Sequence, residues 1–249
     1  MAFANKIKSV AAGVLAISLL TPLAAAAEEK SPIPGTFSAN VGMVSEYFFR
    51  GISQTDDAPA VQGGFDYEVE AAKDITLYAG VWGSNVDFND GASGATLEID
   101  YYGGLRTAIG ETGLSLDAGF IYYSYPGAAG SLNYDFWEVQ AALGYDFGPA
   151  AVTASLNYSP ENFGESGAAY YWKGAIDIPV KMFTLSAYLA RQNIEDNTAF
   201  GSPDYTEWNV SLGTSYAGFD FSLAYSDTNI SPAGDGNSEA VIFSVSRSF

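Results

Sequence analysis

The stretch "VQGGFDYEVE", residues 61–70, alternates between two kinds of side chain. Val61, Phe65, Tyr67 and Val69 are apolar or aromatic, whereas the positions between them are mostly polar or acidic. Successive side chains of a β-strand point to opposite faces, so a period of two indicates a strand with one apolar and one polar face. This stretch therefore predicts a sheet whose two sides meet different environments.

The same pattern recurs along most of the chain. It begins at "FSANVGMVSEYFF", residues 37–49, and returns near 75–86, 96–106, 114–125, 134–147, 151–158, 169–178, 183–193, 205–216, 219–228 and 239–249. All ten prolines lie outside these runs or at their ends, as expected because proline cannot donate to a sheet ladder. We predict about twelve strands, many close to the roughly 9–11 residues that cross a bilayer at a tilt.

The connections between the predicted strands alternate in length. The long ones are rich in Gly, Asp, Asn, Ser and Pro and lie near 51–60, 87–95, 126–133, 159–168, 194–204 and 229–238. The short ones lie near 71–74, 107–113, 148–150, 179–182 and 217–218. Short turns on one side and long loops on the other predict an all-β fold, a transmembrane antiparallel up-and-down β-barrel with periplasmic turns and extracellular loops.

Aromatic residues collect at both ends of the apolar face. Near the long loops they are Tyr47, Phe49, Phe120, Tyr122, Trp137, Tyr158, Tyr170, Trp172, Trp208 and Tyr225. Near the short turns they are Phe37, Tyr67, Tyr145, Phe147, Phe183, Tyr216, Phe219 and Phe249. Two aromatic belts around an aliphatic band predict a surface that faces lipid. The alternative is the core of a soluble periplasmic β-sandwich, in which aromatics need not collect at strand ends.

The composition excludes several kinds of chemistry. The chain has no histidine and no cysteine, and its net charge is -19. The lack of histidine removes Ser-His triads and histidine metal sites, and the acidic balance argues against binding to nucleic acid. Carboxylate pairs such as Glu98 with Asp100 are expected to be solvated lumen residues rather than an acid-base pair. We predict no enzymatic activity, no cofactor and no metal site.

The N-terminal residues have the layout of a secretory signal peptide. Lys6 and Lys8 precede an apolar run over 10–20, and Ala25 and Ala27 are spaced as at a cleavage site. We predict cleavage between Ala27 and Glu28. The predicted organisation is therefore a signal peptide over 1–27, a short periplasmic segment over 28–35 and an outer-membrane barrel over 36–249.

The chain ends on a predicted strand, "AVIFSVSRSF". Phe243, Val245 and Phe249 alternate in register up to the last residue, a pattern that resembles the C-terminal signature of outer-membrane proteins. The resemblance implies recognition by the barrel-assembly machinery through this strand. Arg247 departs from the pattern, but so close to the end it can snorkel to the membrane interface.

One motif is specific enough to suggest a family. "SEYFFRGISQT", residues 45–55, resembles the opening of the TorF family of predicted porins, also catalogued as a domain of unknown function. In length and layout the resemblance extends from about residue 36 to Phe249. It implies a signal-bearing outer-membrane barrel of a Gram-negative bacterium, and it brings no substrate or catalytic residues.

The polar face is expected to line the lumen. Its candidate pore-lining residues are Glu46, Arg50, Asp66, Glu68, Glu98, Asp100, Asp117, Glu138, Lys173 and Arg191. Charges at this density require water or partners, so we predict a narrow, cation-preferring diffusion channel for small hydrophilic solutes. The alternative is a closed barrel with a structural or surface-binding role, its lumen plugged by ion pairs and tyrosines. The oligomeric state stays open.

Arg50 ends an apolar run immediately before a loop. Alternation turns Glu46 and Arg50 inward, with Tyr47 and Phe49 toward lipid. In one interpretation Arg50 ties down the first loop through a nearby carboxylate. The candidate partners are Glu46, Asp56 and Asp57. In the other it forms a cationic spot at the outer mouth with Lys173 and Arg191.

Overall fold

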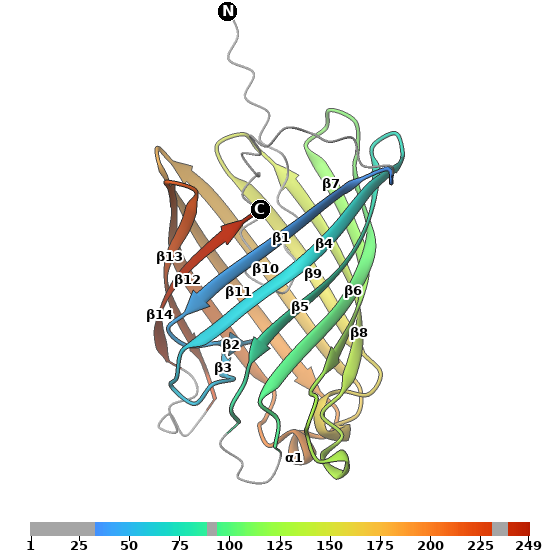
Figure 1. The fold of residues 1–249 in the computed structure, drawn as a ribbon, viewed down its shortest axis with the longest axis vertical. Helices are drawn as coiled ribbons and strands as arrows, with labels where there is room; N and C mark the ends of the chain where they lie inside the picture. The colour runs from blue at the N-terminus through green and yellow to red at the C-terminus, as the bar shows by residue number, and fades with distance from the viewer. Residues whose placement is uncertain (1–32, 89–93, 231–238) are drawn as a thin grey trace, which may run out of the picture.

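The computed structural model describes residues 33–88, 94–230 and 239–249, and the predicted barrel is confirmed. The predicted signal peptide, its cleavage site at Ala27 and Glu28, and most of the segment over 28–35 lie outside the described residues. Twelve strands form a closed barrel in which every strand is antiparallel to its neighbours (Figure 1). They are β1 (Thr36–Val44), β4 (Ala60–Ala72), β5 (Ile75–Asn85), β6 (Leu97–Ala108), β7 (Leu114–Ser124), β8 (Phe136–Asp146), β9 (Ala151–Ser159), β10 (Ala169–Val180), β11 (Phe183–Ile194), β12 (Tyr205–Tyr216), β13 (Phe219–Thr228) and β14 (Ala240–Ser248).

The barrel closes where the first strand meets the last. β1 pairs with β4 on one side and with β14 on the other, and the backbones of Ala39 and Phe249 exchange hydrogen bonds of 3.2 and 2.8 Å. Phe243 is half exposed on the outer surface, and Val245 pairs with Met43 of β1 and Phe221 of β13. The C-terminal signature therefore lies on the strand that completes the sheet.

The two ends of the barrel differ as the connections predict. At the terminal end, where β1 begins and β14 ends, the strands are joined by tight turns. The turn between β12 and β13 has two residues, Ala217 (φ 54) and Gly218 (φ 80), the positive φ angles that favour a hairpin whose twist matches its strands. The loop end carries the short helices η1 (Gly130–Leu132), η2 (Phe163–Glu165) and α1 (Asn197–Phe200).

Alternation determines which side chains face outward. On β6, Leu97, Tyr101 and Leu105 are 39–50% exposed on the outer surface, whereas Glu98 and Asp100, which point into the barrel, are at most 1% exposed.

Exposed aromatic side chains surround the barrel at both ends. At the loop end they include Phe120, Trp137, Tyr170, Trp172 and Tyr225; at the terminal end they include Phe37, Phe147, Tyr216 and Phe249. In the described part of the chain, no helix is long and apolar enough to cross a membrane.

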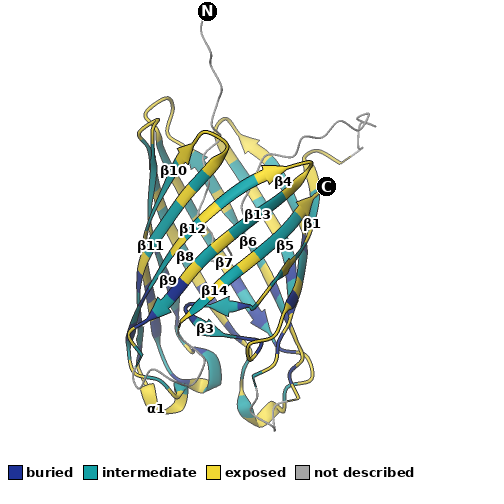
Figure 2. Cartoon of the chain, turned by 90° about the vertical axis from the view of Figure 1, so that its left-hand side faces the viewer, coloured by how far each residue is buried: buried dark blue, intermediate teal, exposed yellow. Residues whose placement is uncertain are grey.

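Burial is uneven along the barrel axis. Buried residues gather near the loop end, whereas the terminal half is intermediate or exposed (Figure 2). The buried apolar cluster includes Tyr47, Trp82, Ile121, Tyr123 and Phe136. The core of this protein therefore lies inside the loop half of the barrel, where an additional segment enters the lumen.

Candidate functional site

The segment that enters the lumen is residues 45–59, which connect β1 to β4 and which we call the tongue. The predicted first strand over 37–49 is too long, because β1 ends at Val44 and the chain then turns inward. The tongue carries a small hairpin of β2 (Phe48–Phe49) and β3 (Ile52–Ser53). Figure 1 shows it at the same end as α1.

The tip of the tongue is a two-residue turn made by Arg50 and Gly51. Both have positive φ angles, 50 and 75°, the conformation of the tight hairpin turns that favour glycine. Gly51 also lies against the barrel wall: a Cβ there would come within 2.7 Å of Glu207 Oε2 and would also clash with Thr228 Cγ2. The tip therefore fits the wall only because residue 51 lacks a side chain.

The base of the tongue is held by Tyr47. Its hydroxyl donates to Glu98 Oε1 at 3.2 Å, its ring packs edge-on against Trp82 with 5.6 Å between centroids, and its backbone N–H donates to Thr55 Oγ1. Phe49 packs against Tyr123 inside the barrel. The prediction that Tyr47 and Phe49 belong to the lipid-facing belt is therefore wrong, because strand alternation stops at Val44.

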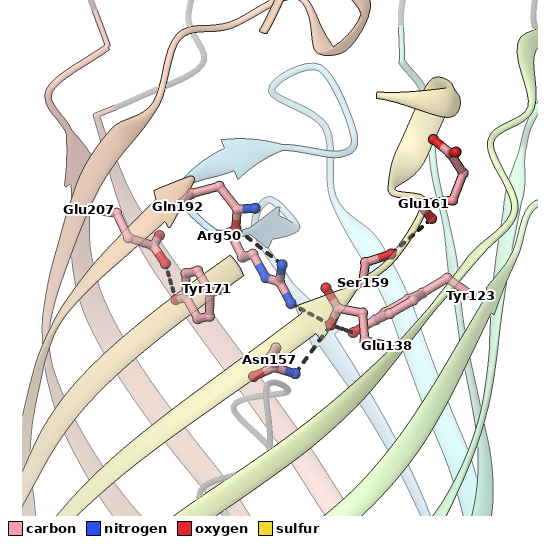
Figure 3. A network of polar contacts seen from close by, with 9 residues as sticks. All are labelled: Arg50, Tyr123, Glu138, Asn157, Ser159, Glu161, Tyr171, Gln192 and Glu207. Atoms are coloured by element: carbon pink, nitrogen blue, oxygen red, sulfur yellow. Dashed lines mark hydrogen bonds and ion pairs between the residues drawn. The ribbon is translucent and has the colours of Figure 1, made fainter. Parts of the chain in front are cut away.

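Arg50 reaches the wall opposite β1 and β4 (Figure 3). Its Nη2 forms an ion pair of 2.6 Å with Glu138 Oε2, and its Nη1 donates to Gln192 Oε1 at 3.1 Å. The guanidinium also lies over the Tyr171 ring, 4.3 Å from its centroid. Arg50 thus pairs with β8 and β11, and the expected pairing with Glu46, Asp56 or Asp57 is wrong.

Hydrogen bonds from neighbouring side chains orient the Glu138 carboxylate toward Arg50. Its Oε2 also accepts from the Tyr123 hydroxyl at 3.3 Å and from Asn157 Nδ2 at 3.2 Å (Figure 3). Glu138 is 1% exposed and Arg50 is 7% exposed. Burial alone would lower the pKa of Arg50, but the charge and hydrogen bond of Glu138 together with the neighbouring Tyr123 and Tyr171 outweigh burial, and the pKa is raised. A buried pair of this kind is expensive to break from one side, by about 3–5 kcal/mol.

A second buried carboxylate, Glu207, lies beside the tip. The Tyr171 hydroxyl donates to Glu207 Oε1, and the Tyr205 hydroxyl donates to the Arg50 backbone oxygen at 2.8 Å. Lys173 lies on the inner face with its Nζ 5.3 Å from the Tyr188 ring centroid. The tip is therefore held through both its side chain and its backbone.

Arg191 does not belong to the lumen. It neighbours Trp172 in the sheet, it donates to Thr206 Oγ1 at 3.2 Å, and its strand neighbour Leu189 is 60% exposed on the outer surface. The expectation that Arg191 lines the pore is wrong, since the buried and therefore inward residue at this level is Gln192. A cationic spot joining Arg50, Lys173 and Arg191 is likewise not formed.

Three other predicted pore-lining residues lie in or beside the tongue. Glu98 and Asp100 are buried beside the base of the tongue, and neither Asp100 oxygen has a hydrogen-bond donor within the described residues. Glu46 lies in the tongue itself. Burial raises the pKa of Glu46, a hydrogen bond with Ser53 lowers it, and the negative charge of Asp57 raises it further.

In the part of the chain that the structure describes, no cluster of three or more acidic residues is arranged to hold a metal ion.

The terminal half of the lumen holds the remaining predicted residues, which are only partly buried. Glu68 forms an ion pair with Arg106, with side chains 33% and 29% exposed. Asp66 accepts from the Tyr102 hydroxyl, and Asp117 accepts from Tyr78 at 2.9 Å. This half is therefore polar and accessible, in contrast to the closely packed loop half.

Sequence reasoning missed three residues that hold the tip: Gln192, Asn157 and Tyr205. Gln192 could have been found, because it lies four residues from Tyr188 on the same strand and so shares its inward face. Asn157 and Tyr205 carry the same signal, because Asn157 adjoins the outward Tyr158 and Tyr205 lies two residues from the inward Glu207. Nothing in the sequence indicates which wall residues an inward loop will contact.

The fold is similar to that of outer-membrane channels of known structure. The COG4313 outer-membrane channel of Pseudomonas putida F1 superposes with a TM-score of 0.55 at 14% identity, covering 88% of this chain and 97% of that one. A NanC porin structure superposes with a TM-score of 0.52 at 10% identity, covering 86% and 98%. At these identities the likeness concerns the fold alone.

Sequence comparisons place the chain in one family. No curated protein sequence matches it. The resemblance to TorF proteins stays a prediction, since the family model that matches is described as "Bacterial protein of unknown function (Gcw_chp)" and spans residues 26–249. The chain therefore belongs to the Gcw_chp family.

Proposed function

We propose that this protein is an outer-membrane channel whose conductance is set by the tongue. The observation that carries the proposal is the division of the lumen: acidic, partly exposed walls occupy its terminal half, and the tongue crosses its loop half. The outer surface supports the location, because an apolar band between aromatic girdles is what a barrel presents to lipid. Twelve strands lie between the eight that side chains fill and the sixteen that leave a wide channel.

The charges of the inner face favour cations. The inward acids of the described strands include Asp66, Glu68, Glu98, Asp100, Asp117, Glu138, Asp177 and Glu207. The inward bases are Arg50, Arg106 and Lys173, and Arg50 is already neutralised by Glu138. A narrow path lined by excess negative charge concentrates counter-ions, so we propose cation preference for small hydrophilic solutes.

Planar-bilayer recordings of two matched variants test the proposal. Arg50→Ala and Arg106→Ala each remove one lumen guanidinium, but only the first releases the tongue. We expect a small, cation-selective conductance for the unaltered protein, a larger one for Arg50→Ala, and little change in conductance for Arg106→Ala. Anion preference would contradict the proposed selectivity. Equal conductance of the two variants would contradict control of the conductance by the tongue.

A closed barrel with a structural or surface-binding role is the second candidate. It is favoured by the burial of the loop half, where Tyr123, Tyr171, Glu138 and Glu207 are at most 3% exposed. Absence of current in both the unaltered protein and Arg50→Ala would support this candidate over the channel.

A further inference from the structure

The wall that receives Arg50 has the chemistry of a guanidinium-binding site. We call Glu138, Gln192, Tyr171, Tyr123 and Asn157 the wall site. Two of its oxygens accept from two different nitrogens of one guanidinium, and an aromatic face lies 4.3 Å from the guanidinium carbon. A planar cation with several donors meets these demands, whereas a compact point charge such as sodium or ammonium can satisfy fewer of them.

All five residues of the wall site belong to strands of the barrel, and Phe49 of the tongue packs against one of them, Tyr123. The five residues come from β7, β8, β9, β10 and β11. Tyr123 and Asn157 both donate to the Glu138 oxygen that Arg50 contacts, so the carboxylate is oriented whether or not Arg50 is present. Such support from neighbouring groups reduces the cost of binding a ligand. The tongue adds the Phe49 ring, whose centroid lies 4.8 Å from the guanidinium carbon.

The hairpin at the end of the tongue is short, whereas the base of the tongue has further internal hydrogen bonds, such as those from Gln54 N–H to the Tyr47 oxygen and from Tyr47 N–H to Thr55 Oγ1. The hairpin pairs only Phe48 with Ser53 and Phe49 with Ile52, and an isolated two-stranded hairpin is at best marginally stable. Among the residues that the structure describes, the buried Nε of Arg50 has no hydrogen-bond partner, so the guanidinium uses only part of its donor capacity there. Tyr47 anchors the base of the tongue, and the contacts that Arg50 and Gly51 make with the wall hold its tip.

We propose that the wall site binds guanidinium-bearing cations, that Arg50 occupies it as a tethered ligand, and that free cations of this class release the tongue by competing with Arg50. Because Arg50 is tethered, its effective concentration is on the order of millimolar or higher, so free cations compete only at comparable concentrations. The acidic walls of the terminal half, at Asp66 and Asp117, raise the local concentration of cations near the site. The role of such cations as transported solutes rests on the proposed function, whereas their binding does not.

Calorimetry on the folded, detergent-solubilised Arg50→Ala protein tests the site directly with methylguanidinium as the probe. We expect saturable binding to Arg50→Ala, and at least tenfold weaker apparent binding both to the Arg50→Ala/Glu138→Gln double variant and to Arg106→Ala, in which Arg50 still competes for the site. Urea, a neutral molecule of similar planar shape, should not bind. Equal affinity of methylguanidinium for the single and double variants would overturn the proposal, as would no binding to Arg50→Ala.

A second measurement uses the unaltered protein and so does not depend on the folding of a variant. Trypsin cleaves after arginine, and Arg50 is protected while it is docked. Because methylguanidinium also competes for the acidic specificity pocket of trypsin, each rate is divided by the rate at which an unstructured arginine peptide is cleaved in the same solution. We expect methylguanidinium at tens of millimolar to accelerate this normalised cleavage after Arg50 several-fold relative to sodium at equal ionic strength; no acceleration would contradict displacement. Binding and release without any ionic current would refute the proposed channel and leave the wall site intact.

Discussion

Replacing Gly51 with alanine tests whether contact between the tip and the wall keeps the tongue inside the barrel. The backbone there has φ 75°, and a left-handed conformation costs a residue with a Cβ about 1–2 kcal/mol. The added Cβ would also lie 2.7 Å from Glu207 Oε2, and Glu207 is fully buried. Overpacking of this kind typically costs about 1–3 kcal/mol, so we expect docking of the tongue to weaken by at least about 2 kcal/mol.

The assay is limited trypsin digestion of the folded protein, with mass spectrometry of fragments that end at Arg50. If opening is fast relative to cleavage, the cleavage rate follows the population of released tongues. A loss of about 2 kcal/mol corresponds to roughly 30-fold faster cleavage after Arg50, because about 1.4 kcal/mol is tenfold in an equilibrium.

Gly218→Ala is the matched control for backbone strain. Gly218 has a similar φ of 80°, lies in the turn between β12 and β13, and has nothing within 4 Å of its added Cβ. Cleavage after Arg50 should be unchanged in this variant. The reasoning would be refuted if Gly51→Ala were cleaved at the unaltered rate, or if Gly218→Ala accelerated cleavage equally.

Two further substitutions separate the lumen from the outer surface. Glu138→Gln leaves Arg50 buried without a counter-charge, which should weaken docking of the tongue by about 3–5 kcal/mol. Trypsin cleavage after Arg50 should then be at least about 100-fold faster. An unchanged rate would show that the ion pair does not hold the tip. Leu212→Arg places a charge in the outer apolar band, where Leu212 is 45% exposed. It should destabilise the barrel in lipid vesicles by up to about 2–4 kcal/mol, measured as a lower urea midpoint, and Ser211→Arg on the inner face should have a smaller effect.

The barrel was predictable because each strand carries its own evidence. The alternation in residues 61–70 specifies the two faces of β4 without reference to any other strand, and the same holds for β14 up to its last residues. Turn lengths then determine which ends meet. These signals are local, and a sheet of neighbouring antiparallel strands needs little more to define its topology.

The site was less predictable because it depends on where local alternation stops. Tyr47 and Phe49 continue the apolar period of β1 in the sequence, yet the chain leaves the sheet after Val44. Their apolar character therefore fits the interior of the barrel as well as it fits lipid. Similarly, the partner of Arg50 is separated from it by 88 residues at Glu138 and by 142 at Gln192, a distance over which sequence spacing carries no geometric information.

These long separations also bear on how the molecule assembles. The tongue follows the first strand, whereas the wall site comes from β7 to β11, and the first strand joins the sheet on its other side only when β14 is in place. Contacts between residues far apart in sequence form late, because a large loop must close before they stabilise anything. The tongue is therefore expected to dock last, into a barrel that is already closed, and a newly folded barrel would pass through a stage in which its lumen is unobstructed.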